Sequence, residues 1–292
     1  MNIISFDTEE WYIEKTYRGA RQEKYRAYDT MLGNLLDLLD ECNMKATFFC
    51  VGQLAVDFPH VIKRIQGKGH EIGCHSNTHQ WLNKMPQDKV LEDTRNALDL
   101  LEQLTGEKVK SYRAPAFSIG KNNQWALEVL AECGIERDAS IFPAARDFGG
   151  FQEFKTQEPT LITINGKRIK EFPITTTKIV GKDIAYSGGG YFRLFPYWFI
   201  QKQMNKARYT MTYFHINDLI TEPRKMLSKE EYERYFKEPG TLINRLNRYI
   251  KTVLGTGQAY PKLEKLLRAN NFMNLVDADT AIDWEKAPHV IL

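Results

Sequence analysis

Two histidines and a group of acidic residues offer the clearest chemistry in this sequence. His75 and His79 are four residues apart, so on one helical turn both imidazoles would lie on the same face and reach a single cation. The first apolar run of the chain ends at Asp7, and Glu9 and Glu10 follow it closely. Imidazole nitrogen and carboxylate oxygen are ligands of Zn²⁺ and related divalent ions. We therefore expect a metal site, although the histidine spacing alone also fits the start of a surface helix.

Three further ionisable residues stand at or near the ends of short apolar runs. They are Arg113, Asp138 and His215. Taken singly, each has an ordinary structural explanation, as a surface guanidinium, a helix-cap partner or a satisfied core imidazole. Together with Asp7 and His75 they would form one site only if the fold brings the ends of these runs together.

The elements that would position these residues alternate between strand and helix. Apolar, β-branched and aromatic runs predict strands at residues 3–6, 46–51, 71–74, 109–112, 137–141 and 210–215. Amphipathic patterns predict helices at residues 29–39, 61–65, 86–105 and 125–133, with a long loop at residues 11–28. Strand followed by helix, repeated about every 30 to 35 residues, is typical of parallel βα units. Since such strands end on one face, we expect the ionisable residues to converge there.

The pattern changes after residue 148. An alternating run at residues 160–170 is broken by Asn165-Gly166, the strongest short-range hairpin signal, so we expect an antiparallel insertion. Three glycines at residues 188–190 lack the spacing of a phosphate-binding loop and predict a tight loop near a ligand or a neighbouring backbone. Further helices are predicted at residues 196–207, 229–236, 242–253 and 261–270. No flexible linker interrupts the chain, so we expect one domain over residues 1–292, with a core at about 1–220 and a helical C-terminal extension.

Composition narrows the classes of function. Of the 292 residues 42% are hydrophobic and 26% charged, and the formal net charge is +3, values of an ordinary globular protein. The basic clusters are short and mixed with aromatic and apolar residues, so we expect no nucleic-acid partner. No apolar stretch approaches the ~20 residues of a membrane span, and the first residues lack the positive start of a signal peptide. We therefore expect a cytoplasmic protein, or one peripheral to a membrane, whose four cysteines are free thiols.

Five short motifs punctuate the chain. They are Asp7-Thr-Glu-Glu-Trp, His75-Ser-Asn-Thr-His79, Arg113-Ala-Pro-Ala-Phe117, Asp138-Ala-Ser-Ile-Phe-Pro143 and Phe214-His215. In that order and at those separations they resemble the motifs of the polysaccharide deacetylases of the NodB-homology superfamily, also called carbohydrate esterase family 4. The stretch Ser187-Gly-Gly-Gly-Tyr-Phe-Arg193 is similar to a bacterial branch found with exopolysaccharide and capsule genes. The resemblance is strong over about residues 1–220 and weak beyond them.

The resemblance implies a fold and an activity. The fold is an α/β distorted (β/α)₇ barrel, and the activity is metal-dependent hydrolysis of the N-acetyl group of a sugar in a polysaccharide or its precursor. Residue by residue, Asp7 matches the general base and Arg113 the residue that holds it. His215 matches the catalytic histidine that protonates the leaving amine, and Asp138 matches the partner that keeps this histidine charged.

The resemblance also implies a metal set, with one departure. His75 and His79 match the two imidazole ligands of a single ion, usually zinc. The family's first motif has two adjacent aspartates, whereas Thr8 follows Asp7 here, so we take Glu9 as the third ligand and keep Glu10 in reserve. The positions matched to substrate binding are Pro115, Phe117 and Tyr191.

Two other functions stay open beside hydrolysis of an acetylated oligosaccharide or polysaccharide. The altered acidic cluster is compatible with a non-catalytic relative that binds carbohydrate. An amidohydrolase acting on a small cyclic amide would share every catalytic residue and differ only in its loops.

Overall fold

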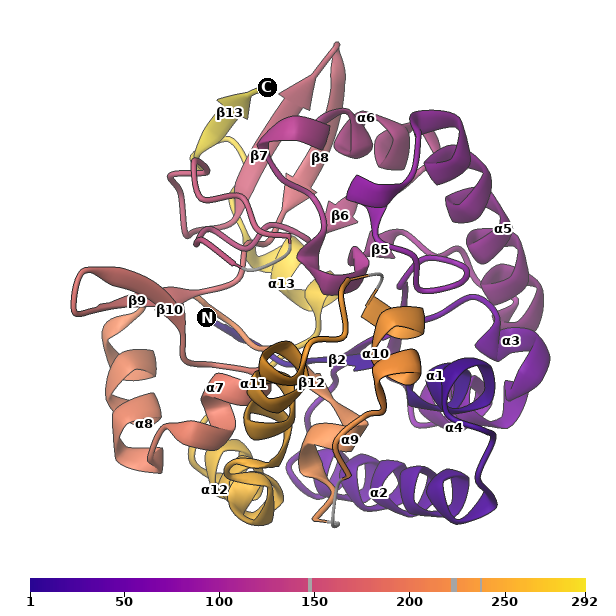
Figure 1. The fold of residues 1–292 in the computed structure, drawn as a ribbon. Helices are drawn as coiled ribbons and strands as arrows, with labels where there is room; N and C mark the ends of the chain where they lie inside the picture. The colour runs from indigo at the N-terminus through magenta and orange to yellow at the C-terminus, as the bar shows by residue number, and fades with distance from the viewer. Residues whose placement is uncertain (147–148, 222–224, 237) are drawn as a thin grey trace.

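Parallel strands form the centre of the molecule (Figure 1). They are β1 (Asn2–Ile3), β2 (Ser5–Thr8), β3 (Thr47–Cys50), β4 (Glu71–Cys74), β5 (Ser111–Tyr112), β6 (Arg137–Asp138), β8 (Lys167–Glu171), β11 (Thr210–Met211) and β12 (Phe214–His215). Hydrogen bonds join them in the order β12-β2-β3-β4-β5-β6-β8, and β11 pairs with β1. Strands β1 and β2, from the start of the chain, are therefore neighbours of β11 and β12. This computed structural model describes residues 1–146, 149–221, 225–236 and 238–292, without the side chains of residues 251, 252 and 256.

The two ends of this series meet at an irregular seam. The Met211 backbone N–H donates to Thr175 Oγ1 (2.9 Å), and the Tyr209 hydroxyl donates to Pro173 O (3.0 Å), just beyond β8. Within the described residues no strand ladder joins β8 to β11, so side chains link the two ends. Because β1 with β2, and β11 with β12, each occupy one position, the series has seven positions. The predicted α/β fold, a distorted (β/α)₇ barrel, is confirmed.

Helices cover the outside of the strands. They are α2 (Gln22–Glu41), α4 (Pro59–Gly67), α5 (Gln87–Thr105), α6 (Trp125–Glu132), α8 (Tyr197–Lys206) and α12 (Ala259–Ala269). Strand β3 shows how the core divides, since Phe48 packs with the helix-facing cluster and Phe49 with the cluster inside the barrel. The next strand makes room for this ring with Gly73, where an added Cβ would lie 2.6 Å from the Phe49 ring. The interior of the barrel is therefore packed rather than open.

The predicted long loop at residues 11–28 is wrong. Helix α1 (Glu10–Tyr17) follows β2 directly, and α2 begins at Gln22 rather than at Asp29. Trp11 and Tyr28 are buried and meet edge to face at 5.5 Å, and Trp11 Nε1 donates to Asp29 Oδ1 (3.2 Å). Asp29, where we expected the helix to begin, is an acceptor in the first half of a longer helix. Tertiary packing of the aromatic rings stabilises α1 and the start of α2, which the weak apolar pattern of this segment did not predict.

The predicted antiparallel hairpin is confirmed. Strand β7 (Thr160–Ile164) pairs with β8 around Asn165 and Gly166, whose φ angles are both positive, at 46° and 79°. Strand β8 also pairs in parallel with β6, so one arm of the hairpin is itself a barrel strand. A second hairpin, β9 (Thr176–Ile179) with β10 (Lys182–Ala185), lacks an Asn-Gly turn and was not predicted. The last strand, β13 (His289–Ile291), pairs with β7, and α13 (Leu275–Ala281) precedes it.

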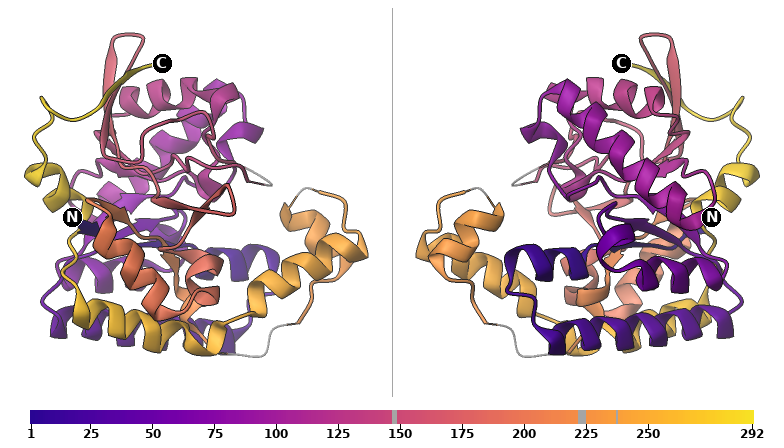
Figure 2. Two further views of the ribbon diagram at one scale, coloured as in Figure 1. Left: turned by 90° about the vertical axis from the view of Figure 1, so that its left-hand side faces the viewer. Right: turned by 90° about the vertical axis from the view of Figure 1, so that its right-hand side faces the viewer.

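Two C-terminal helices stand out from the barrel on the side of the strands' carboxyl ends (Figure 2). They are α10 (Lys229–Phe236) and α11 (Leu242–Val253), at the predicted positions. Tyr235 of α10 meets Tyr17 of α1 edge to face at 5.2 Å, which fixes α10 beside the first helix. The shorter helices are α3 (Leu54–Asp57), α7 (Gly189–Leu194) and α9 (Ile216–Leu219). Among the described residues no helix combines the length and the apolar character needed to cross a bilayer.

Candidate active site

The carboxyl ends of the strands bring the predicted residues to one side of the barrel. In the parallel ladders His215 lies opposite Asp7, and Thr8 lies opposite Cys50, which in turn lies opposite Cys74. The residue that follows Cys74 is His75, and the residue that follows Thr8 is Glu9 at the start of α1. Chain positions more than 200 residues apart thus become neighbours through backbone pairing.

Glu9 and the two histidines form a compact cluster of possible ligand atoms. Glu9 Oε2 lies 2.5 Å from His79 Nε2 and 3.3 Å from His75 Nε2, and the three ligand atoms lie within 4.8 Å of one another. His75 Nδ1 donates to the carbonyl oxygen of Arg113 (2.7 Å), which leaves the Nε2 lone pair directed at the cluster. Two imidazole nitrogens and one carboxylate oxygen are the ligand set of an open, catalytic zinc site. The residues present therefore fit a divalent cation.

The segment that carries the histidines is a loop and not the helical turn that their spacing suggested. Ser76 and His79 have left-handed φ angles of 60° and 56°. Asp93 of α5 holds the loop, because its carboxylate accepts from the Asn77 backbone N–H (2.8 Å) and the Thr78 hydroxyl (3.3 Å). The rings converge because the loop is tied to α5. Asp93 was missed, since a single acid on an amphipathic helix carries no distinguishing signal in the sequence.

Glu10 points away from the cluster. Its Oε1 accepts from the Asn217 backbone N–H (2.8 Å) and its Oε2 from the backbone N–H of Glu9 (3.3 Å). Burial raises the pKa of the Glu10 carboxyl to about 7, although the charge of His215 opposes the shift. Of the two acids considered as third ligand, Glu9 is the one beside the histidines.

A buried ion pair lies next to this cluster. Arg113 Nη1 donates to Asp7 Oδ1 (2.8 Å) and to Ser5 Oγ (2.9 Å), and Arg113 Nε donates to Ala139 O (3.1 Å). Arg113 is fully buried and its guanidinium lies 4.3 Å from the centre of the Phe49 ring. A permanently charged guanidinium in this position pairs with the Asp7 carboxylate and fixes its orientation.

His215 faces both acids from the opposite side. Its Nε2 lies 3.9 Å from Asp7 Oδ2 and 3.8 Å from Glu9 Oε1. Its Nδ1 lies 3.0 Å from Asp218 Oδ2, one turn further along the chain. Burial lowers the pKa of His215, but the carboxylates of Glu9, Asp218 and Asp7 outweigh it and raise the pKa to about 10.

Asp218 is itself held in its charged form. Burial raises the pKa of this carboxyl, but the hydrogen bond and charge of His215, and then the charge of Arg193, bring the pKa down to about 2. Arg193 Nη1 pairs with Asp218 Oδ1. The chain Arg193–Asp218–His215 thus orients the imidazole from behind.

Comparison with known families follows this geometry. Residues 25–137 match the family model named polysaccharide deacetylase, and residues 139–279 match a domain of unknown function, DUF3473. Residues 25–137 therefore carry the sequence pattern of a polysaccharide deacetylase domain. Asp7 and Glu9 precede that match and His215 follows it, so the site draws on more of the chain than the deacetylase model covers.

Curated relatives match over shorter lengths. A peptidoglycan-N-acetylglucosamine deacetylase of Bacillus cereus is 38% identical over 95 residues, which are 32% of this chain and 34% of that protein. A peptidoglycan-N-acetylmuramic acid deacetylase of Bacillus subtilis is 30% identical over 106 residues, which are 34% of this chain and 40% of the relative. The chain thus spans about a third to two fifths of the length of these relatives.

Solved structures share the deacetylase fold over the whole chain. A Mycobacterium smegmatis protein assigned to the polysaccharide deacetylases covers 100% of this chain and 92% of its own, with a TM-score of 0.66 and 16% identity. A carbohydrate esterase family 4 pseudoenzyme from Bacillus anthracis has a TM-score of 0.51 and 12% identity, over 100% of this chain and 69% of its own. At these identities the likeness shows the fold alone.

The prediction that Asp138 is the partner of His215 is wrong. Asp138 is fully buried on β6, where Oδ1 accepts from the Ser140 hydroxyl (2.6 Å) and Oδ2 from the Ser140 backbone N–H (3.3 Å). Its other neighbour is Glu171, paired with it on β8, and burial raises the pKa of both carboxyls. Asp138 therefore supports the barrel wall beside Arg113. The partner of His215, the position that we assigned to Asp138, is Asp218.

The three residues matched to substrate binding lie in different surroundings. Pro115 and Phe117 form a short 3₁₀ turn and are both buried, and the Phe117 ring packs on Tyr213 with a centroid distance of 5.0 Å. They support the wall of the site and offer no exposed face. Tyr191 on α7 is 42% exposed, which leaves its ring accessible to a ligand.

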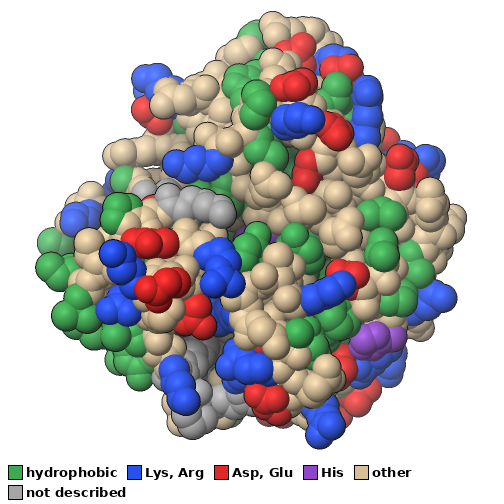
Figure 3. Space-filling model, turned by 45° about the vertical axis from the view of Figure 1, so that its right-hand side comes forward, with side chains coloured by type: hydrophobic (Ala, Val, Ile, Leu, Met, Phe, Trp, Pro, Cys, Tyr) green, Lys and Arg blue, Asp and Glu red, His purple; other side chains and the backbone are tan. Residues whose placement is uncertain are grey.

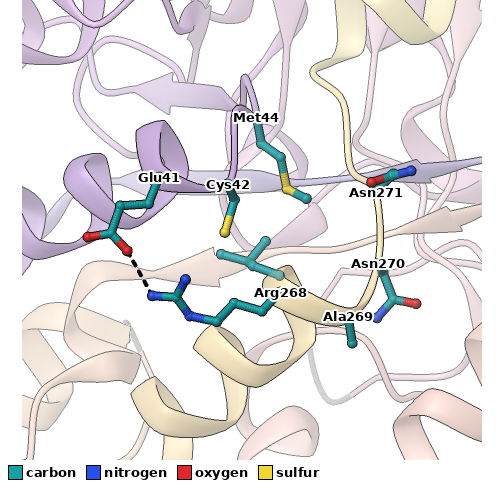
Figure 4. Close-up of a pocket in the computed structure, with 8 residues that line it drawn as sticks. Glu41, Cys42, Met44, Arg268, Ala269, Asn270 and Asn271 are labelled. Carbon is teal, nitrogen blue, oxygen red and sulfur yellow. Dashed lines mark hydrogen bonds and ion pairs between the residues drawn. The ribbon is translucent and has the colours of Figure 1, made fainter.

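A separate cavity of about 390 Å³ lies between the ends of α2 and α12 (Figure 4). Arg268 crosses it to pair with Glu41 at 2.8 Å, and Cys42, Met44 and Asn271 complete much of its lining. Met44 precedes β3 in the chain, and Asn271 O accepts from Asn2 of β1, so the cavity is at the amino ends of the strands. It belongs to the end of the barrel opposite the candidate active site.

Proposed function

We propose that the protein removes the acetyl group from an N-acetylated sugar of a polysaccharide or of its precursor, with the help of a divalent metal ion. One observation carries the proposal: Glu9, His75 and His79 converge beside the Asp7–Arg113 ion pair, and His215 faces them. Water, acetyl carbonyl and leaving nitrogen all need a partner during amide hydrolysis. The site offers Asp7 for the water, a metal ion held by Glu9 and the two histidines for the carbonyl, and His215 for the leaving nitrogen.

Glu9, His75 and His79 would hold the metal ion, which we take to be zinc. Two nitrogens and one oxygen on a wall of the barrel leave the remaining positions open, as catalytic zinc sites require. A bound ion of this kind polarises the acetyl carbonyl and makes water more acidic. His75 is prepared for this role because the Arg113 carbonyl fixes its tautomer.

Asp7 would act as the general base. It is nearly fully buried and keeps Oδ2 toward His215 while Oδ1 accepts from Arg113, so one carboxylate oxygen remains available for the proton of an attacking water. Arg113 holds this carboxylate in place. The same Nη1 atom also donates to Ser5 Oγ, so that the guanidinium, and with it Asp7, has little freedom to turn away.

His215 would act as the general acid. Its Nε2 faces the two acids and its Nδ1 is held by Asp218, so a proton on Nε2 is directed into the site. The leaving nitrogen of the sugar takes this proton as the C–N bond breaks, and acetate and a free amine result. Asp218 acts as a positioning residue, because its carboxylate contacts the imidazole and the backbone N–H of His215 and the guanidinium of Arg193.

The substrate class follows from kinship and from the mouth of the site. The two curated relatives are named for peptidoglycan N-acetyl sugars, and the stretch at residues 187–193 resembles a branch associated with exopolysaccharide and capsule. We therefore propose a chain of N-acetylated sugars from a cell-surface polymer as substrate. Exposed Tyr191 would stack against a sugar ring.

Acetate release is the direct test. The purified chain is incubated with N-acetylated and O-acetylated oligosaccharides and with a small cyclic amide, before and after EDTA treatment and after Zn²⁺ or Co²⁺ is restored. Metal-dependent acetate release from the N-acetylated oligosaccharides supports the proposal. Carbohydrate binding with no release under any metal condition would instead identify a non-catalytic relative, and turnover of the cyclic amide alone would identify a different amidohydrolase.

The ligand assignment has its own test. His75→Ala and His79→Ala should each lose the bound metal, measured by atomic absorption, and keep the wild-type circular dichroism spectrum. His60→Ala is the matched control, because its side chain is about half exposed and pairs with Asp29 on the outer surface. Wild-type metal content in either of the first two variants would remove that histidine from the ligand set.

A further inference from the structure

Helix α11 packs on the protein with its apolar face turned outward. Large aliphatic side chains at helical spacing are exposed along it, and Ile243 is the most exposed of them, at 70%. The others are Leu242, Leu246, Ile250 and Leu254, at the end of the helix. None of the described residues of α11 is buried. A surface helix ordinarily buries such a face, so a contiguous exposed row of this kind marks a binding surface.

The cationic face of the same helix is turned inward. Arg245 Nη1 donates to the carbonyl oxygen of Leu227 (3.1 Å), and the Arg248 guanidinium lies 4.3 Å from the centre of the Phe236 ring on α10. Both arginines are half-buried. The polar side of α11 therefore faces the protein, whereas its large aliphatic side chains are exposed.

Exposed apolar residues continue from α11 onto α7 and α8. Leu194 and Trp198 are 52% and 64% exposed. The end of α11 touches α7, because a Cβ added at Gly255 would lie 2.4 Å from the carbonyl oxygen of Arg193. Figure 1 shows α7 between α8 and α11, and Figure 3 shows hydrophobic side chains at the left-hand edge of that face, beside both basic and acidic side chains. We call the exposed apolar side chains of α7, α8 and α11 the apolar surface. They are Leu194, Trp198, Leu242, Ile243, Leu246, Ile250 and Leu254.

The segments that supply the apolar surface contain no acidic residue, although α10 beside α11 carries Glu230, Glu231 and Glu233. Residues 186–217 and 239–263, which supply α7, α8, α11 and the start of α12, hold eight of the 40 Lys and Arg residues and none of the 37 Asp and Glu residues. The rest of the chain has 32 cationic residues against 37 acidic ones. A protein with a net charge of only +3 thus concentrates positive charge where it exposes apolar side chains.

From this combination we infer that the apolar surface docks on an anionic lipid bilayer. Exposed Leu, Ile and Trp side chains enter the boundary between headgroups and acyl chains, while the exposed side chains of Lys202, Lys206 and Arg208, on and just after α8, attract anionic headgroups. A second copy of the chain fits this surface less well, because a symmetric dimer would bring two positively charged faces together. The inference does not depend on the proposed activity.

Docking would also fix the orientation of the active site. Tyr235 of α10 packs on Tyr17 of α1, the helix that begins next to Glu9. The apolar surface and the candidate active site are therefore connected through the α10–α11 pair. Binding through α11 would hold the mouth of the barrel close to the lipid surface, where a membrane-attached glycan would meet it.

Vesicle sedimentation tests the inference. The full chain is mixed with large unilamellar vesicles of phosphatidylcholine alone, or of equimolar phosphatidylcholine and phosphatidylglycerol, and the bound fraction is measured at low and high salt. We expect binding to the anionic vesicles that weakens as salt rises, and much weaker binding to phosphatidylcholine. Ile243→Glu and Leu246→Glu should each reduce binding to anionic vesicles about tenfold or more, because each removes an inserted side chain and adds a negative charge.

Ile291→Glu is the matched control. Ile291 is 78% exposed on β13, away from α11, so this variant undergoes the same chemical change outside the apolar surface. Wild-type binding by Ile291→Glu, with reduced binding by Ile243→Glu, supports the inference. No binding of the wild type to anionic vesicles, or equal loss in both variants, overturns it. A wild-type dimer in analytical ultracentrifugation that Ile243→Glu dissociates, without vesicle binding, would assign the surface to a second copy instead.

Discussion

Replacing Asp218 by asparagine tests whether this residue, rather than Asp138, holds the proposed acid. His215 Nδ1 lies 3.0 Å from Asp218 Oδ2, and Asp218 is one of three carboxylates that raise the pKa of His215 to about 10 against the effect of burial. Asparagine keeps the shape and an acceptor oxygen for His215 and Arg193, but it removes the negative charge. The substitution therefore isolates the electrostatic part of the contact.

The expected shift follows from the contact distance. A carboxylate within about 4–6 Å changes the pKa of a neighbouring group by about 1–3 units, and each unit corresponds to about 1.4 kcal/mol. A raised pKa keeps the imidazolium protonated to higher pH, so the loss of Asp218 lowers the pKa and moves the high-pH limb of kcat/KM downward by about 1–3 units. A cation at Glu9 opposes the imidazolium in both enzymes, so the predicted quantity is the difference between them.

The assay is kcat/KM for an N-acetylated oligosaccharide as a function of pH, with metal content measured for each enzyme. Asp138→Asn is the matched control, because it makes the same change at a buried aspartate whose acceptors are occupied by Ser140. We expect its high-pH limb to stay in place. If Asp138→Asn moves the high-pH limb down and Asp218→Asn does not, then Asp138 is the partner of His215, as the sequence suggested, and the assignment of Asp218 is refuted. If neither moves it, the titrating group is not His215.

Three further predictions concern single residues. Glu9→Ala should lose bound metal by atomic absorption, whereas Glu10→Ala should keep it and lower the free energy of unfolding in urea by about 1–3 kcal/mol, because two backbone N–H groups lose their acceptor; loss of metal from Glu10→Ala alone would reverse the assignment. Asp7→Asn should lower kcat by a factor of about 10²–10⁴ with little change in KM, and a wild-type kcat would exclude Asp7 as the base. Burial lowers the pKa of His70 to about 4 from the ordinary histidine value of 6.5, so the unfolded chain binds the proton first as pH falls. The stability that neutral His70 contributes is complete above about pH 6.5 and is lost toward pH 4, by about 3 kcal/mol. The free energy of unfolding of His70→Gln in urea should therefore depend less on pH over that range than that of the wild type. An unchanged pH dependence would contradict the argument.

The parallel βα units could be predicted from the sequence, whereas the barrel was implied by the resemblance to the polysaccharide deacetylases. Runs such as residues 46–51 are apolar and β-branched or aromatic, and several are followed by an amphipathic helical pattern, as at residues 61–65, 86–105 and 125–133. Elements held by tertiary contacts were harder to predict. Helix α1 was taken as part of a loop because its buried Trp11 and Ile13 stand beside equally buried Glu10 and Glu14, which blur the apolar pattern.

The candidate site was predicted in part for a similar reason. Motifs named the residues that touch the cluster, and Asp7, Glu9, His75 and His79 do lie together. They did not name the residues that hold these side chains in place. Asp218 was overlooked although it stands three residues after His215 and caps the start of α9, a spacing that could have suggested a partner for the imidazole.

The pairing of β12 with β2 explains why positioning residues escape such motifs. Neighbouring strands lie ~4.8 Å apart, and paired residues on them share one face of the sheet; this is how His215 comes to stand beside Asp7. The register is set one step earlier, where Thr212 Oγ1 donates to Ile3 O (2.9 Å) and Ser5 Oγ donates to Thr212 O. A slip of one residue would turn His215 to the other face and separate the proposed acid from the proposed base. Two hydroxyl side chains without chemistry of their own thus determine whether the proton-transfer pair can form at all.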